Sequence, residues 1–261
     1  MRSDHRARHL RTERYALGLF SATFRAPDLA SGILPGQFVM LDVPERIRPY
    51  LRRAYSVADA RPESGEVEFL VKTVGPGTRA LEELPEGSEA ALLGPLGNSF
   101  SVAGLSAGAR VAVVAGGIGA APFPLLYRAL GRAGIAADLF LGGRGEKDLA
   151  FRRRFDGLVT GETVLATDDG SLGEKGFVTE VFRGRARQTR YTRVYACGPM
   201  PMFRALAGVT RELAIEAEFS TEAEMGCGFG ACLGCVIPGV EKPFLVSCSE
   251  GPILAPEKIA W

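Results

Sequence analysis

Four of the five cysteines in this chain of 261 residues lie close enough together in the sequence to bind one metal centre. They follow the spacing C-x4-C-x2-C-x12-C, at Cys227, Cys232, Cys235 and Cys248. Three closely spaced thiolates followed by a more distant fourth are the ligand pattern of 2Fe-2S clusters. Glycines between them let the backbone wrap around a cluster and point its N–H groups at the sulfurs. We therefore predict that these four cysteines ligate a 2Fe-2S cluster.

Zinc is the alternative metal for such a set, because four thiolates also suit its tetrahedral coordination. Structural zinc sites usually present two pairs of closely spaced ligands, whereas Cys248 has no second cysteine beside it. The charged segment Met1–Arg6 does not resemble a signal peptide. We therefore expect a reducing, cytoplasmic environment, in which clustered cysteines bind metals rather than form disulfides.

A second group of residues can bind a flavin. Arg53, Ala54, Tyr55 and Ser56 lie on a predicted strand, Arg53–Val57, where alternate side chains share a face. A flavin needs a cation for its pyrophosphate, an aromatic face for its ring and a small donor near its reactive nitrogen, and this segment has all three. Taken alone, however, these four residues are better explained as an ordinary edge strand.

Two neighbouring segments extend the flavin hypothesis. Leu70, Val71 and Lys72 follow on the next predicted strand, Val67–Val74. The segment Gly75-Pro76-Gly77-Thr78 then opens a predicted helix, Thr78–Leu84. Free N–H groups at a helix start, with a threonine hydroxyl, form a site for a pyrophosphate. A simple hairpin turn explains Gly75–Gly77 equally well.

A glycine-rich loop indicates a nucleotide site. The apolar strand predicted at Arg110–Ala115 leads into it, and a helix is predicted over Ala120–Gly131. Gly117, Gly119 and Pro122 form the pattern G-x-G-x-x-P, which places proline in the first turn of the helix and backbone amides against a pyrophosphate.

The predicted strands that follow add residues to this site. The strand Ala136–Leu141 lacks the acidic residue that usually ends it in NAD-binding domains, and Arg144 follows instead. The choice between NAD and NADP therefore stays open. Thr167–Ser171 is predicted to form a surface turn. Cys197-Gly198-Pro199 ends the predicted strand Arg193–Ala196, where the residues alone are consistent with a small buried cysteine.

Three scaffolds are needed to position these residues. Short β-rich runs separated by turns predict an N-terminal antiparallel flavin-binding β-barrel. Strands alternating with helices then predict a parallel-sheet, α/β nucleotide-binding domain. The Gly- and Cys-rich end is too poor in apolar periodicity for a core of its own, and it predicts a small iron–sulfur loop domain. We place these three domains at residues 1–102, 103–214 and 215–261.

Composition excludes several classes of function. The chain has 31 basic and 30 acidic residues and a net charge of +1, so neither nucleic acid nor an anionic membrane is an expected partner. The most apolar stretch, Val111–Leu130, is broken by glycines and prolines and is not a membrane span. His5 and His9 are expected to be solvated at a frayed N-terminus, which leaves no evident acid–base pair for substrate chemistry.

Taken together, R-x-Y-S at Arg53–Ser56, Leu70–Lys72, Gly75–Thr78 and the G-x-G-x-x-P loop resemble the ferredoxin–NADP reductase family. The resemblance implies that Ser56 and Cys197 are catalytic residues beside the flavin and the nicotinamide. It implies FAD contacts at Arg53, Ala54, Tyr55, Ser56, Leu70, Val71, Lys72, Gly77 and Thr78. It implies nucleotide contacts at Gly117, Gly119, Pro122, Gly198 and Pro199.

The stretch Glu222–Cys235, followed by Cys248–Pro252, resembles the electron transfer subunits of class 1B dihydroorotate dehydrogenases, and the resemblance covers nearly the whole chain. That family implies one FAD and one 2Fe-2S cluster per chain, in a heterotetramer with two FMN-containing catalytic subunits. Electrons are then expected to pass from dihydroorotate through FMN, the cluster and FAD to NAD+, in pyrimidine biosynthesis. A flavin can join the two ends because it exchanges both one and two electrons.

Other functions share parts of this pattern. The small subunits of NADH-dependent ferredoxin–NADP oxidoreductases and the gamma subunits of hydrogenase or sulfhydrogenase complexes have the same order of domains. Cysteine rather than aspartate as the first cluster ligand, Cys227, disfavours the former. From a different class, a zinc-stabilised nucleotide-binding module also fits.

Overall fold

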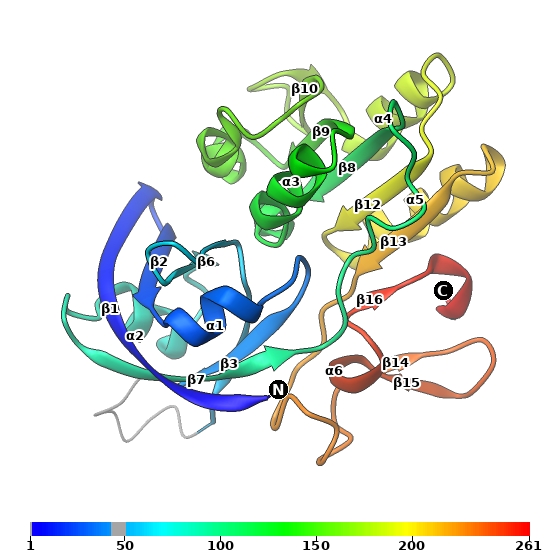
Figure 1. Ribbon diagram of the computed structural model, residues 1–261. Coiled ribbons are helices and arrows are strands. Elements are labelled where there is room, and N and C mark those ends of the chain that lie inside the picture. Colours follow the sequence, from blue (N-terminus) through cyan, green and yellow to red (C-terminus); the bar gives the residue numbers. More distant parts are fainter. Residues whose placement is uncertain (1, 43–50) are drawn as a thin grey trace.

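The computed structural model describes residues 2–42 and 51–261, and it has three regions in chain order (Figure 1). An antiparallel sheet in blue and cyan is followed by a mainly parallel sheet in green to yellow. An orange-to-red C-terminal region lies beside both. This arrangement confirms the predicted fold class. One of the short β-rich runs predicts a strand over Gly36–Val43, and the last residue of that range lies outside the described residues.

The first sheet has the strand order β4-β3-β7-β1-β2-β6-β5, and all of its pairings are antiparallel. Alternate side chains of β2 and β6, such as Phe20, Phe24 and Phe69, are buried in one core. The strands β4 and β6 lie near each other, so the sheet curls into a half-barrel. Its elements are β1 (Ser3–Ala16), β2 (Leu19–Arg25), α1 (Pro27–Gly32), β3 (Phe38–Asp42), β4 (Arg53–Ser56), β5 (Asp59–Arg61), β6 (Glu66–Lys72), α2 (Pro76–Glu82) and β7 (Glu89–Leu96).

The expectation of a frayed, solvated N-terminus is wrong. β1 is a long strand that pairs with both β2 and β7. His9 is only 1% exposed, and its ring nitrogens contact the Pro85 carbonyl oxygen at 3.0 Å and the Thr12 hydroxyl at 3.0 Å. The charged residues of β1 occupy its solvent face, and their density hid the alternation that buries Ala7 and His9.

The second sheet has the order β11-β10-β9-β8-β12-β13-β16, in which only β16 runs antiparallel. Alternation along β8 divides its side chains between two cores: Val111 and Val113 pack with α3, whereas Ala112 and Val114 pack with α4 and α5. Covering both faces explains the continuous apolar run from which this strand was predicted.

The elements of this sheet are β8 (Arg110–Gly116), η1 (Gly117–Ala120), α3 (Phe123–Arg132), β9 (Ala136–Gly143), η2 (Glu146–Phe155), β10 (Thr163–Thr167), β11 (Glu174–Lys175), α4 (Val178–Ala186), β12 (Arg193–Cys197), α5 (Met200–Glu212), β13 (Glu216–Ser220) and β16 (Ile253–Leu254). The helix predicted from Ala120 starts later, at Phe123. Pro122 has no backbone N–H to donate to the preceding turn, and a separate 3-10 turn, η1, precedes α3. No helix among the described residues is long and apolar enough to cross a membrane.

The C-terminal region adds β14 (Val236–Pro238), β15 (Phe244–Val246), α6 (Ser247–Glu250) and η3 (Pro256–Lys258). Cys235 and Cys248 pack against barrel residues Phe38, Met40 and Leu96 rather than in a separate large core. At the end of the barrel, the Asn98 side chain donates to the Ile253 carbonyl oxygen at 2.8 Å and accepts from the Ile253 N–H at 2.9 Å. The barrel therefore holds this region in place.

Buried charges join the barrel to the parallel-sheet domain. The fully buried carboxylate of Asp59, on β5, accepts two hydrogen bonds from Arg128 of α3, at 2.6 and 2.9 Å. Glu68, on β6, accepts two from Arg154 of η2, at 3.1 and 2.6 Å. Because each buried carboxylate of the barrel is paired with an arginine of the other domain, these ion pairs hold the two domains in one orientation.

Replacing Asp59 with asparagine is expected to lower the free energy of unfolding by about 3–5 kcal/mol, because arginines would lose their buried counter-charge. Urea denaturation followed by circular dichroism measures this. Asp4→Asn, which breaks the exposed pair with Arg52, is the control and should cost less than about 1 kcal/mol. Equal effects of the two substitutions would contradict the interdomain role.

Candidate functional site

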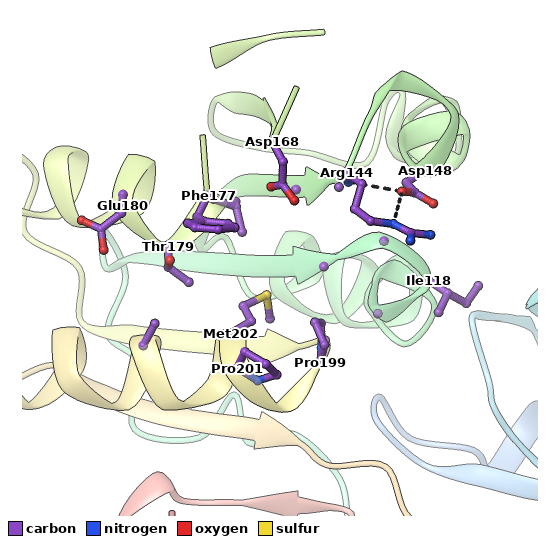
Figure 2. A pocket seen from close by; sticks show the side chains of 18 of the residues that line it. Ile118, Arg144, Asp148, Asp168, Phe177, Thr179, Glu180, Pro199, Pro201 and Met202 are labelled. Atoms are coloured by element: carbon purple, nitrogen blue, oxygen red, sulfur yellow. Dashed lines mark hydrogen bonds and ion pairs between the residues drawn. The ribbon is translucent and has the colours of Figure 1, made fainter. Parts of the chain in front are cut away.

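The parallel sheet has a topological switch point between β8 and β12. β9 and β10 lie on one side of β8, while β12 and β13 lie on the other. In open sheets of this kind, ligands bind outside the carboxyl ends of the strands at such a point. A cavity of about 670 Å³ lies there, and its size suits a nucleotide ligand (Figure 2). Five of the predicted site residues line it: Lys72, Gly117, Gly119, Gly198 and Pro199.

The floor of the cavity is formed by two loops in close contact. A Cβ atom on Gly119 would lie 2.3 Å from the carbonyl oxygen of Cys197, so only glycine fits between the end of β8 and the end of β12. Gly117 has a φ of +55°, with open space where a side chain would point. The backbone is thus exposed to a ligand at Gly117 and pressed against β12 at Gly119.

The barrel reaches the cavity through Lys72. Its ammonium group lies 3.2 Å from Asp148 of η2, and Asp148 also accepts from the backbone N–H of Arg144 at 3.2 Å. Burial alone would raise the pKa of Asp148, but Lys72 and then Arg144 lower it below its usual range. Figure 2 shows Arg144 turned toward Asp148. One carboxylate therefore holds both Lys72 and Arg144 at the cavity wall.

Several cavity residues were not predicted from the sequence. At the end near β9 and β10, the walls include Asp168, Phe177, Thr179 and Glu180 (Figure 2). Phe177 is 66% exposed although it is aromatic, and it directly precedes α4. An exposed ring at the edge of a cavity is suited to stacking on a base. Asp168 was expected in a surface turn, which the structure does form, and the family resemblance also implied that this turn lies beside the nucleotide site.

We predict that Phe177→Ala weakens the binding of ADP-ribose by about fivefold or more, since stacking of a base on an aromatic ring contributes about 1–3 kcal/mol. Isothermal titration calorimetry measures the affinity. Phe244→Ala removes a similarly exposed ring outside the cavity and is the matched control, for which no change is expected. Unchanged ADP-ribose affinity in Phe177→Ala would exclude the stacking role.

The opposite end of the cavity is lined by Glu222, near the buried Cys197. Cys197 is buried at the end of β12, and Glu222 lines the cavity just beyond β13. Burial, and to a smaller extent the nearby Glu222 carboxylate, raises the pKa of the Cys197 thiol well above its ordinary value. The thiol therefore stays protonated and neutral beside the nucleotide loop.

The predicted flavin segment forms β4, at the edge of the barrel sheet. Arg53, Tyr55 and Ser56 are half-buried and Ala54 is exposed, so the strand keeps one accessible side. The Tyr55 ring packs on Phe69 with 6.2 Å between centroids, and burial raises the pKa of Tyr55 to about 12. An open edge with a cation and a neutral phenol fits a flavin.

Other predicted flavin residues are engaged within the protein. The side chains of Leu70 and Val71 are buried, so a cofactor can meet only their backbone. The Thr78 hydroxyl accepts from the N–H groups of Val74 and Gly75, at 2.9 and 3.1 Å, and donates to the Gly75 carbonyl. This cap orders the start of α2, where the N–H groups of residues 77 and 78 have no partner within the helix. Ser56, Cys197 and Pro122 do not line the cavity.

The four clustered cysteines form two pairs. The thiol of Cys227 contacts Cys232, and that of Cys248 contacts Cys235. Among the described residues, no three metal-binding side chains converge closely enough for a single ion. Two pairs suit a two-iron cluster, in which each iron takes two thiolates, better than one zinc ion.

Backbone N–H groups point at these sulfurs, as a cluster requires. The N–H groups of Gly230, Cys232 and Cys248 lie 3.1, 3.4 and 3.4 Å from the sulfurs of Cys248, Cys227 and Cys235. Burial opposes ionisation, yet such N–H groups lower the pKa of the Cys227 thiol to about 6, whereas burial and the contact with Cys235 raise the pKa of the Cys248 thiol to about 12. The donor set therefore fits anionic sulfur ligands.

Three family models match the chain. Residues 16–100 match an oxidoreductase FAD-binding domain, and residues 113–207 match an oxidoreductase NAD-binding domain. Residues 222–260 match the iron–sulfur cluster binding domain of dihydroorotate dehydrogenase B. The chain is thus an oxidoreductase subunit that binds FAD, NAD(H) and an iron–sulfur cluster.

Similar proteins narrow the assignment to one family. The dihydroorotate dehydrogenase B (NAD+) electron transfer subunit of Lysinibacillus sphaericus is 36% identical over 248 residues, or 94% of each chain. The subunit of that name from Bacillus caldolyticus is 38% identical over 84% of each chain. The chain belongs to the family of dihydroorotate dehydrogenase B electron transfer subunits.

Solved structures share the fold. A chain from the NADH-dependent reduced ferredoxin–NADP oxidoreductase superposes with a TM-score of 0.86 and 27% identity, covering 98% of this chain and 90% of that one. The ferredoxin reductase of carbazole 1,9a-dioxygenase gives a TM-score of 0.68 and 28% identity, covering 82% of this chain and 65% of that one.

Proposed function

We propose that this chain relays electrons from an FMN-containing dihydroorotate dehydrogenase catalytic subunit to NAD+, through a 2Fe-2S cluster and FAD. The observation that supports this most is that the barrel contacts both the nucleotide cavity and the cysteine loop. It carries Lys72 into the nucleotide cavity and packs Met40 beneath the cysteine loop. A flavin on such a barrel adjoins both redox partners, and it can join one-electron and two-electron chemistry.

The residues have separate roles in this proposal. Arg53 and the start of α2, at Gly77 and Thr78, bind the FAD pyrophosphate, while Tyr55 and Ser56 border its ring. The loop at Gly117 and Gly119 holds the nucleotide phosphates. Cys197, as a neutral thiol, and Gly198 and Pro199 border the nicotinamide. The four cysteines hold the cluster. We also propose that the boundaries between the three domains lie near residues 102 and 214.

An apolar surface around the cysteines is suited to docking the catalytic subunit. Phe229, Leu233, Val236, Val240 and Phe244 are all large, apolar and exposed. They belong to the cysteine loop and the adjoining β14–β15 hairpin, and Cys232 is itself exposed. Exposed apolar patches of this kind mark protein interfaces. We propose a cytoplasmic heterotetramer of two relay and two catalytic subunits.

Isolation of the tagged chain from its native host, under anaerobic conditions, tests this function. The expected product is a coloured complex with an FMN-containing subunit that reduces NAD+ with dihydroorotate. Removal of that subunit should abolish the activity. A coloured complex that oxidises NADH with dyes but ignores dihydroorotate would instead favour a ferredoxin or hydrogenase partner. A colourless protein would favour the zinc-stabilised module.

A further inference from the structure

Glu222 places a carboxylate at the nicotinamide end of the nucleotide cavity. It lines the cavity, two residues beyond the end of β13, and it lies close enough to Cys197 to act on that thiol electrostatically. The neighbouring residue is firmly held, because both the N–H and the hydroxyl of Thr221 donate to the Pro252 carbonyl, at 2.9 and 2.8 Å. The position of Glu222 is therefore built into the fold.

Within the described part of the chain, this carboxylate lacks the partner that Lys72 and Arg144 have, as does Asp168 at the other end of the cavity. Lys72 and Arg144 are both held by Asp148. For Glu222, no hydrogen bond or ion pair is formed with any residue of the described segments 2–42 and 51–261, and burial raises its pKa. The side chain is nevertheless exposed to solvent within the cavity. Its unpaired charge is stabilised when a ligand displaces that solvent and brings an opposite charge to it.

The ligand of this cavity changes charge at one place during its reaction. The nicotinamide ring of NAD+ carries one positive charge, and the ring becomes neutral when it accepts a hydride. The adenosine and the pyrophosphate are the same in both forms. A fixed negative charge near the ring therefore attracts the oxidised form more strongly than the reduced form.

We propose that Glu222 selects the redox state of the bound nucleotide, because its carboxylate stabilises the cationic ring of NAD+ relative to the neutral ring of NADH. This inference rests on the proposed function. For a subunit that reduces NAD+, the carboxylate favours binding of the substrate. Hydride transfer then neutralises the ring, which removes that attraction and favours release of the product.

Calorimetric titration of the full chain, loaded with FAD and cluster, tests the proposal at about pH 8, where carboxylates are ionised. Three probes are compared: NAD+, tetrahydro-NAD and ADP-ribose. Tetrahydro-NAD keeps the carboxamide but has a neutral ring and donates no hydride, whereas ADP-ribose has no ring. We expect Glu222→Gln to weaken NAD+ about tenfold and to leave the other two within about twofold.

Two further variants separate charge from shape. Glu222→Asp keeps the charge and is expected to retain most of the preference for NAD+ over tetrahydro-NAD. Glu224→Gln removes an exposed charge nearby on the same segment, outside the cavity, and should change no affinity. In the wild-type chain, added salt should reduce the preference for NAD+, which tests the proposal even if Glu222→Gln fails to fold.

The outcomes are distinct. Equal losses for NAD+ and tetrahydro-NAD in Glu222→Gln would overturn the proposal and make Glu222 a ligand of the carboxamide. Unchanged NAD+ affinity, or a wild-type preference that salt does not affect, would also overturn it. A wild-type chain that binds none of the three probes would overturn the proposed function together with this inference.

Discussion

Replacing Cys235 with serine is expected to abolish electron transfer between the catalytic partner and NAD+ while leaving NADH-dependent reduction of the flavin intact. Cys235 is 1% exposed and lies between the barrel and the cysteine loop. Serine fits the space but is a poor ligand for iron, so the cluster should not form. Dihydroorotate-dependent NAD+ reduction should fall by about two orders of magnitude or more.

The same preparations show whether the loss is specific. The cluster's visible absorption and its electron paramagnetic resonance signal should be missing from Cys235→Ser. NADH oxidation with a dye, which needs only FAD and the nucleotide cavity, should stay near the wild-type rate. Ser249→Ala, beside Cys248 on α6, is the control and should retain the cluster. Full partner-dependent activity in Cys235→Ser would exclude the cluster from the route.

Gly119→Ala is expected to disrupt the nucleotide site and to destabilise the domain. The new methyl group would lie 2.3 Å from the Cys197 carbonyl oxygen. Both groups are attached to backbone segments that the sheet holds in place. Separating the two loops should lower the free energy of unfolding by about 1–3 kcal/mol, as overpacking generally does. Because the displaced loop also binds the nucleotide, NAD+ affinity should fall by about tenfold or more, which corresponds to about 1.4 kcal/mol of binding free energy.

Gly131→Ala is the matched control, because it makes the same substitution at a position without a close contact. Gly131 lies within α3, and a Cβ atom there would meet nothing within 4 Å. Gly131→Ala should therefore leave NAD+ binding unchanged and stabilise the helix by up to about 1 kcal/mol. Urea denaturation and NAD+ titration of both variants make the comparison. Similar behaviour of the two would show that the close approach at Gly119 is unimportant.

Features with a strong local signal were predictable from the sequence. The strand predicted at Arg110–Ala115 ends only one residue later, since both of its faces are apolar. The spacing of the cysteines and glycines identified the metal-binding loop, because such a loop must fold tightly around its ligand. The loop from Gly117 to Gly119 was also evident, and the structure places it in the cavity.

Other features depend on contacts between distant parts of the chain. The charged strand β1 was missed because its solvent face dominates its composition. Phe177 and Glu222 line the cavity only because α4 and the segment after β13 are brought to the same edge of the sheet. Their local sequence resembles any exposed aromatic or acidic residue. Similarly, nothing beside Asp59 in the sequence indicates its arginine partner in α3.

The most direct test of the relay is an anaerobic titration of the FAD- and cluster-loaded chain with NADH. Visible absorption reports the flavin, and electron paramagnetic resonance reports the cluster. If the chain connects the two centres, NADH should reduce both of them, whereas in Cys235→Ser only the flavin should respond. A wild-type cluster that stays oxidised while the flavin is fully reduced would contradict the proposed route from one centre to the other.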